Sequence, residues 1–139
     1  MSLVLDNSVA MLWLLPQSNP AGLALAQKVL DLLQDNGAQV PSLWHLEVAN
    51  VMAKSLRLNK ITQAQASTFV ALLEALDIAT DAETSLRALH DTLDLARRYH
   101  LSAYDAAYLE LALRKGLPLA TLDTQLLAAA EQAGVPVLI

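Results

Sequence analysis

The chain has 139 residues, of which 55% are hydrophobic, with a formal net charge of −5 and no cysteine. This length is enough for one domain with a buried core, and the absence of cysteine excludes disulfides and thiolate metal sites. The few positive side chains argue against tight, non-specific binding to nucleic acid, which usually needs a basic patch. We expect no membrane span, because the apolar run 9–15 is far shorter than the ~18 residues that a span requires. The lack of cysteine fits a cytoplasmic protein best.

Short apolar runs alternate along the chain with longer helical patterns. The expected strands cover residues 3–5, 39–40, 78–79, 117–121 and 135–138. The expected helices cover residues 8–15, 21–35, 43–58, 62–76, 82–99, 103–115 and 123–133. Such alternation predicts a parallel sheet with helices on both faces.

Two acids come directly after expected strands. Asp6 follows the run LVL, and Asp123 follows LPLATL. Ligands bind at the carboxyl ends of the strands in sheets of this kind, so both acids stand where a functional site is expected. Taken singly, each acid is also well explained as the N-cap of the helix that follows it.

Glu47 lies in the expected helix SLWHLEVANVM, on the same face as Leu43 and Val51. An unpaired glutamate on an apolar face loses hydration, which costs a few kcal/mol or raises its pKa. Glu47 has no capping role. The alternatives are a pairing with a base or hydroxyl group, or a helix turned so that this glutamate is exposed.

Asp105 lies near the start of the expected helix 103–115, with Leu109 and Ala112 on its own side. An apolar stripe at helical spacing runs beside it, formed by Leu101, Tyr104, Tyr108 and Leu111. Ser102 and Asp105 also have the spacing of a capping box. The other ten acids are expected on polar helix faces or in turns: Asp31, Asp35, Glu74, Asp77, Asp81, Glu83, Asp91, Asp94, Glu110 and Glu131.

Four carboxylates at one end of a parallel sheet would repel one another unless a cation neutralised them. Ligand sets made only of oxygen suit Mg²⁺ or Mn²⁺, and such an ion can activate water and stabilise charge on a phosphate. The pattern therefore points to phosphodiester hydrolysis. Ser8 could position a metal-bound water, or it could simply start a helix. The three histidines lack the spacing of a zinc site, and no Walker loop is present.

Four stretches carry a family resemblance: VLDNSV, PSLWHLEVANVM, LSAYDAAYLELA and LATLDTQL. With these motifs in this order, the sequence resembles PIN-domain proteins of the VapC-like toxin branch of bacterial toxin–antitoxin systems. The resemblance implies one PIN-like domain over residues 1–139, a three-layer α/β/α sandwich around a parallel sheet of about five strands. It also implies a Mg²⁺- or Mn²⁺-dependent endoribonuclease. The positions that match the family's acidic site are Asp6, Glu47, Asp105 and Asp123. Ser8 matches the hydroxyl residue that often follows the first acid two positions later in the family.

The resemblance further implies a homodimer and a small antitoxin protein that blocks the site. Candidate docking surfaces are the run 9–15 and the helical pair 43–58 and 62–76. RNA recognition would rest on few cations, either Lys54, Arg57 and Lys60 or Arg97 and Arg98. Two other interpretations stay open: a non-catalytic partner-binding domain whose acids are helix caps, and a PIN nuclease that acts on DNA.

Overall fold

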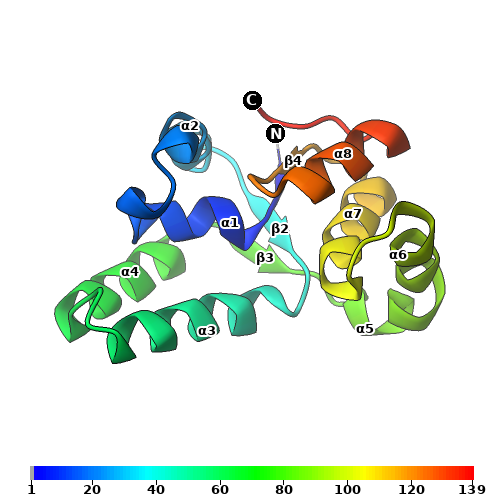
Figure 1. Ribbon diagram of the computed structural model, residues 1–139. Coiled ribbons are helices and arrows are strands. Elements are labelled where there is room, and N and C mark those ends of the chain that lie inside the picture. Colours follow the sequence, from blue (N-terminus) through cyan, green and yellow to red (C-terminus); the bar gives the residue numbers. More distant parts are fainter. Residues whose placement is uncertain (1) are drawn as a thin grey trace.

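A four-stranded parallel sheet lies between two layers of helices (Figure 1). The structure is a computed structural model and describes residues 2–139. The strands are β1 (Leu3–Leu5), β2 (Ala38–Val40), β3 (Ile78–Thr80) and β4 (Leu119–Ala120). The α-helices are α1 (Asn7–Ala10), α2 (Leu23–Leu32), α3 (Trp44–Arg57), α4 (Gln63–Ala75), α5 (Thr84–Arg87), α6 (Leu93–Tyr99), α7 (Ala103–Lys115) and α8 (Thr124–Ala133). Short 3₁₀ turns cover Met11–Trp13, Pro16–Ser18 and Pro20–Gly22, and a π-helical turn covers Ala88–Thr92.

The strand order is β3-β2-β1-β4. Right-handed crossovers between parallel strands place helices on opposite faces when the chain changes direction across the sheet. Accordingly, α1 to α4 lie on one side of the sheet and α5 to α7 on the other (Figure 1). The direction changes between β1 and β4, and such a switch point is where open α/β sheets form a ligand-binding crevice.

The strands are short; β1 and β4 are fully buried, whereas the edge strand β3 is largely exposed. Leu3, Val4 and Leu5 of β1 are all buried, as expected for a strand covered on both faces. The expected sandwich is therefore confirmed. The fifth expected strand, 135–138, contributes only one parallel bridge, between Val137 and Leu119. Within residues 2–139, every helix is too short or too polar to span a bilayer.

The run 9–15 belongs to the core rather than to a docking surface. Its members Val9, Ala10, Met11, Leu12 and Leu15 are buried. Trp13 is half-buried, and its Nε1 donates a hydrogen bond to the carbonyl oxygen of Ala26 in α2 (2.9 Å). The expectation that this run offers a free docking surface is wrong, because its apolar side chains already pack beneath α2 and α3.

Candidate active site

Asp6 stands at the carboxyl end of β1, beside the end of β4, and is only 4% exposed. Its Oδ2 accepts hydrogen bonds from the hydroxyls of Thr121 (2.6 Å) and Ser8 (2.7 Å). Asp6 occupies the N-cap position of α1, but its side chain makes no capping hydrogen bond. Burial raises the pKa of Asp6, with a further rise from Asp123, while the two hydroxyl hydrogen bonds oppose the rise. The capping interpretation therefore does not explain this buried carboxyl group.

Ser8 connects the two strand ends. Its hydroxyl donates to Asp6, and its Oγ accepts a hydrogen bond from the backbone N–H of Leu122 (2.9 Å). Thr121 has a similar double role, since its Oγ1 accepts from the N–H of Asp123 (3.1 Å). These two hydroxyls fix the position of the Asp6 carboxyl group relative to the loop that carries Asp123.

Asp123 does cap a helix, as one interpretation proposed. Its Oδ1 accepts a hydrogen bond from the N–H of Leu126 in the first turn of α8 (2.9 Å). One carboxylate oxygen of Asp123 thus accepts a hydrogen bond from the first turn of α8. The negative charge of Asp123 also lies close enough to raise the pKa of both Asp6 and Asp105. Capping and membership of the acidic cluster are thus compatible.

Glu47 lies in the first turn of α3 and is half-buried. The hydroxyl of Tyr108, a fully buried residue of α7, donates a hydrogen bond to Glu47 Oε1. Burial raises the pKa of Glu47, as do the negative charges of Asp6 and Asp105, while the bond from Tyr108 opposes the rise. Glu47 is therefore neither exposed nor paired with a base, and its partner is a hydroxyl.

Asp105 lies in the first turn of α7 and is partly exposed. Ser102 caps this helix, because its side chain accepts a hydrogen bond from the Asp105 N–H (3.1 Å). Burial raises the pKa of Asp105, followed by the negative charges of Asp123 and Asp6. The structure thus brings all four sequence-predicted acids into one mutually repelling group.

No cation of residues 2–139 forms an ion pair with any of these four acids. Equally, no three Asp, Glu, His or Cys side chains within those residues are already arranged to hold a metal ion together. The group has the oxygen donors and the unneutralised charge that suit Mg²⁺ or Mn²⁺. Mg²⁺ typically keeps several waters and needs only one or two carboxylates directly, so the donor set fits such an ion.

The sequence model of the family described as "PIN domain" matches residues 3–132. The chain belongs to the PIN-domain family. PIN domains are generally nucleases, and they typically use divalent metal ions. Among curated protein sequences, none matches this chain significantly.

Two solved structures share the fold. PAE2754 from Pyrobaculum aerophilum is 24% identical, with a TM-score of 0.67 over 99% of this chain and 92% of that one. VapBC2 from Rickettsia felis, bound to a DNA fragment from its promoter, is 14% identical, with a TM-score of 0.65 over 99% of this chain and 98% of that one. At sequence identities this low, the similarity to these two structures shows that the fold is shared.

Two residues of this PIN domain that touch the acids were not singled out from the sequence. The sequence predicts Thr121 at the end of a strand and Tyr108 in an apolar helical stripe. A polar residue at the last position of a strand, two before an acid, was the available signal for Thr121. For Tyr108 the spacing i, i+3 from Asp105 was available, but only tertiary packing brings its hydroxyl to Glu47. Tyr104, from the same stripe, is 67% exposed rather than packed.

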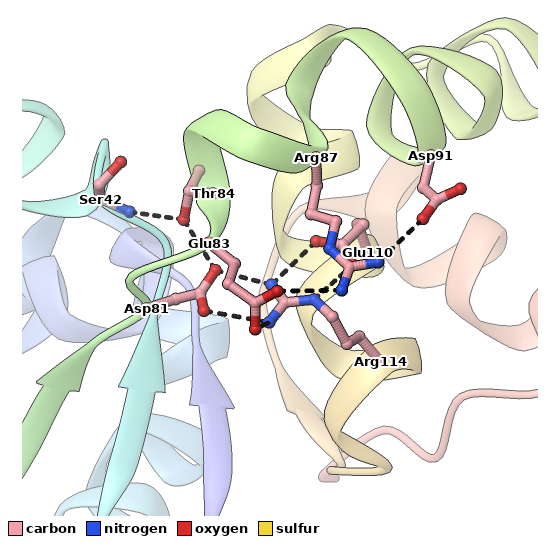
Figure 2. A network of polar contacts seen from close by, with 8 residues as sticks. All are labelled: Ser42, Asp81, Glu83, Thr84, Arg87, Asp91, Glu110 and Arg114. Atoms are coloured by element: carbon pink, nitrogen blue, oxygen red, sulfur yellow. Dashed lines mark hydrogen bonds and ion pairs between the residues drawn. The ribbon is translucent and has the colours of Figure 1, made fainter.

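A second group of acids in the PIN domain is neutralised. Figure 2 shows Arg114 of α7 between Asp81 and Glu110, with ion-pair distances of 2.6 and 2.8 Å, and Glu83 at 3.4 Å. Burial acts to raise the pKa of Asp81, but hydrogen bonds from Arg114 and Thr84 outweigh it, and the pKa is lowered. Glu110 is buried, so its expected position on a polar helix face is wrong, and Asp81 lies in the turn region after β3, as expected, but is buried as well. Each is buried because Arg114 supplies the opposite charge.

Proposed function

We propose that this PIN domain is a Mg²⁺- or Mn²⁺-dependent endoribonuclease, the toxin of a toxin–antitoxin pair. The observation that carries the proposal is the contrast between its two acidic groups. Asp81 and Glu110 have an arginine partner, whereas Asp6, Glu47 and Asp105 have pKa values raised by burial and by neighbouring acids. No cation of the described residues pairs with these three acids or with Asp123, whose charge contributes to the rise for Asp6 and Asp105. Carboxylates kept together against their repulsion are typical of a metal site.

In this proposal Asp6, Asp105 and Asp123 hold one or two divalent ions, directly or through water, and Glu47 helps to hold an ion or orients the attacking water. When bound, the metal would supply an activated water and neutralise charge on the phosphate. Ser8 and Thr121 keep the Asp6 carboxyl group in place through their hydrogen bonds. Cleavage by in-line attack of water would leave a 5′-phosphate and a 3′-hydroxyl, as the family resemblance implies.

The proposal is tested by incubating the purified protein with total cellular RNA in EDTA, Mg²⁺ or Mn²⁺, beside the variant Asp105→Asn. We expect metal-dependent cleavage by the wild type, and loss of cleavage by the variant without loss of folding. Single-stranded DNA of mixed sequence serves as a second substrate. Cleavage of the DNA alone would transfer the assignment to a DNA nuclease. No cleavage of either substrate in any metal would favour the non-catalytic binding domain.

We propose that the antitoxin docks on the apolar surface between α3 and α4. We also propose that the domain forms a homodimer through its apolar surface. A groove of about 360 Å³ lies between α3 and α4, lined by apolar side chains that include Trp44, Val48, Met52, Val70 and Leu73. The VapC-like resemblance and the fold shared with VapBC2 support this partner class. An arginine from the antitoxin would pair well with the four carboxylates.

A further inference from the structure

The positive side chains of the domain fall into two sets. Arg87, Arg97, Arg98 and Arg114 form ion pairs with Asp or Glu, and Lys28 donates a hydrogen bond to the carbonyl oxygen of Ile139. Within residues 2–139, the cations with neither an ion pair nor a side-chain hydrogen bond are Lys54, Arg57, Lys60 and Lys115. Only this second set is available to bind a polyanion without first breaking an ion pair or a hydrogen bond.

Two of the unpaired cations lie on one side of α3. Asn50, Lys54 and Arg57 follow Glu47 at i+3, i+7 and i+10, a spacing that keeps them within about a quarter of the helix circumference. All three are exposed. We call them the basic face of α3. At 1.5 Å per residue, Lys54 and Arg57 lie about 10 and 15 Å along the helix from Glu47.

The rival pair is neutralised. Arg97 and Arg98 both pair with Asp94 of α6, at 2.8 and 3.1 Å. Lys115 ends α7 at i+10 from Asp105, the same spacing as that of Arg57 from Glu47, but it is a single cation without a second one beside it on that helix face. The basic face of α3 is therefore the one set of unpaired cations on a helix face that begins at an acid of the candidate site.

We propose that the basic face of α3 binds the backbone of single-stranded RNA where the strand leaves the carboxylate site. The inference rests on the proposed ribonuclease function and names the surface that recognises its substrate. Phosphates are repelled by four acids but attracted by unpaired lysine and arginine. A strand held at both places would lie along α3, with Asn50 between the acids and the cations as a hydrogen-bonding residue.

The test compares two double variants that remove the same charge. Lys54→Gln/Arg57→Gln changes the basic face, and Arg97→Gln/Arg98→Gln changes the neutralised pair. The initial rate of cleavage of dilute total cellular RNA is measured in Mn²⁺ over a range of NaCl. All four side chains are exposed, so both variants should fold, and their thermal unfolding is checked against the wild type.

For single-stranded nucleic acid, the logarithm of the binding constant falls with the logarithm of the salt concentration by about 0.7 for each phosphate contact. The loss of one contact therefore lowers the affinity about fivefold at 0.1 M salt. We therefore expect the Lys54/Arg57 variant to be about 25-fold slower at 0.1 M NaCl, with a salt slope lower by about 1.4. The Arg97/Arg98 variant should stay within about twofold of the wild type. Equal effects of the two variants, or none, would overturn the inference while leaving the ribonuclease standing. An inactive wild type would overturn both.

Discussion

At the scale of single residues, one hydrogen bond links the two helices that carry Glu47 and Asp105. Tyr108 is buried in α7 and donates to Glu47 in α3. Burial and the neighbouring acids raise the pKa of Tyr108, so it remains a hydrogen-bond donor at every working pH. Tyr108 is a positioning residue, because it acts on the site only through Glu47.

Tyr108→Phe should leave the fold intact and lower RNA cleavage. The ring keeps its packing, and the lost bond to a charged group costs about 1.5–3 kcal/mol at most, less here because Glu47 can turn toward water. Residues that orient metal ligands typically change metal affinity or activity by about 10–100-fold. The measurement is kcat and the Mn²⁺ concentration for half-maximal activity. Tyr104→Phe, the same change at an exposed position of α7, is the control. Equal activity of both variants would contradict the role of Tyr108.

At the scale of elements, α7 is held at both ends. Its first turn brings Asp105 to the site, while Glu110 and Arg114 near its other end join Asp81, which directly follows β3 (Figure 2). Thr84 donates to Asp81 (2.9 Å) and ties the start of α5 into the same network. The orientation of α7 across the sheet thus depends on a partly buried arginine.

Arg114→Met should destabilise the protein by about 3–5 kcal/mol, because it leaves Asp81 and Glu110 buried without a counter-charge. Chemical denaturation measures the loss. The control is Arg97→Met, which breaks an exposed ion pair worth less than about 1 kcal/mol. Should Arg114→Met prove as stable as the control variant, the network would not hold α7 in place.

The elements were largely predictable from periodicity, Asp6 and Asp123 of the candidate site from strand ends, and Glu47 and Asp105 from acids beside apolar helix faces. The three expected strands from 3–5 to 78–79 appear within a residue of their bounds, because apolar runs between turns have few alternatives. The expected helix 82–99 contains a π-helical turn at Ala88–Thr92, which no propensity signals. Arg114 lies one helical turn after Glu110 and is a local partner, but Asp81, which helps to bury this pair, reaches Arg114 only in the folded chain. Long-range pairing of this kind, like the bond from Tyr108, cannot be derived from local sequence.

At the scale of the whole molecule, the carboxylate site lowers the stability of the metal-free protein. Asp6, Glu47 and Asp105 have pKa values raised by folding. An acid with a raised pKa binds more protons in the folded state, so stability falls as pH rises from the unfolded value through the folded value. The resulting cost is absent below about pH 4 and grows as the pH rises above that value. A bound divalent ion reverses this effect by stabilising the charged carboxylates.

The most direct measurement is thermal unfolding of the wild type and Asp105→Asn, each in EDTA and in Mn²⁺, near neutral pH. In EDTA, Asp105→Asn should unfold at a higher temperature than the wild type, because one repelling charge is gone. In Mn²⁺ at about 100 times its Kd, the wild type should gain about 2.7 kcal/mol, a Tm increase of several degrees, and the variant much less. If Mn²⁺ left the Tm of the wild type unchanged, or raised both proteins equally, the four acids would not form a metal site.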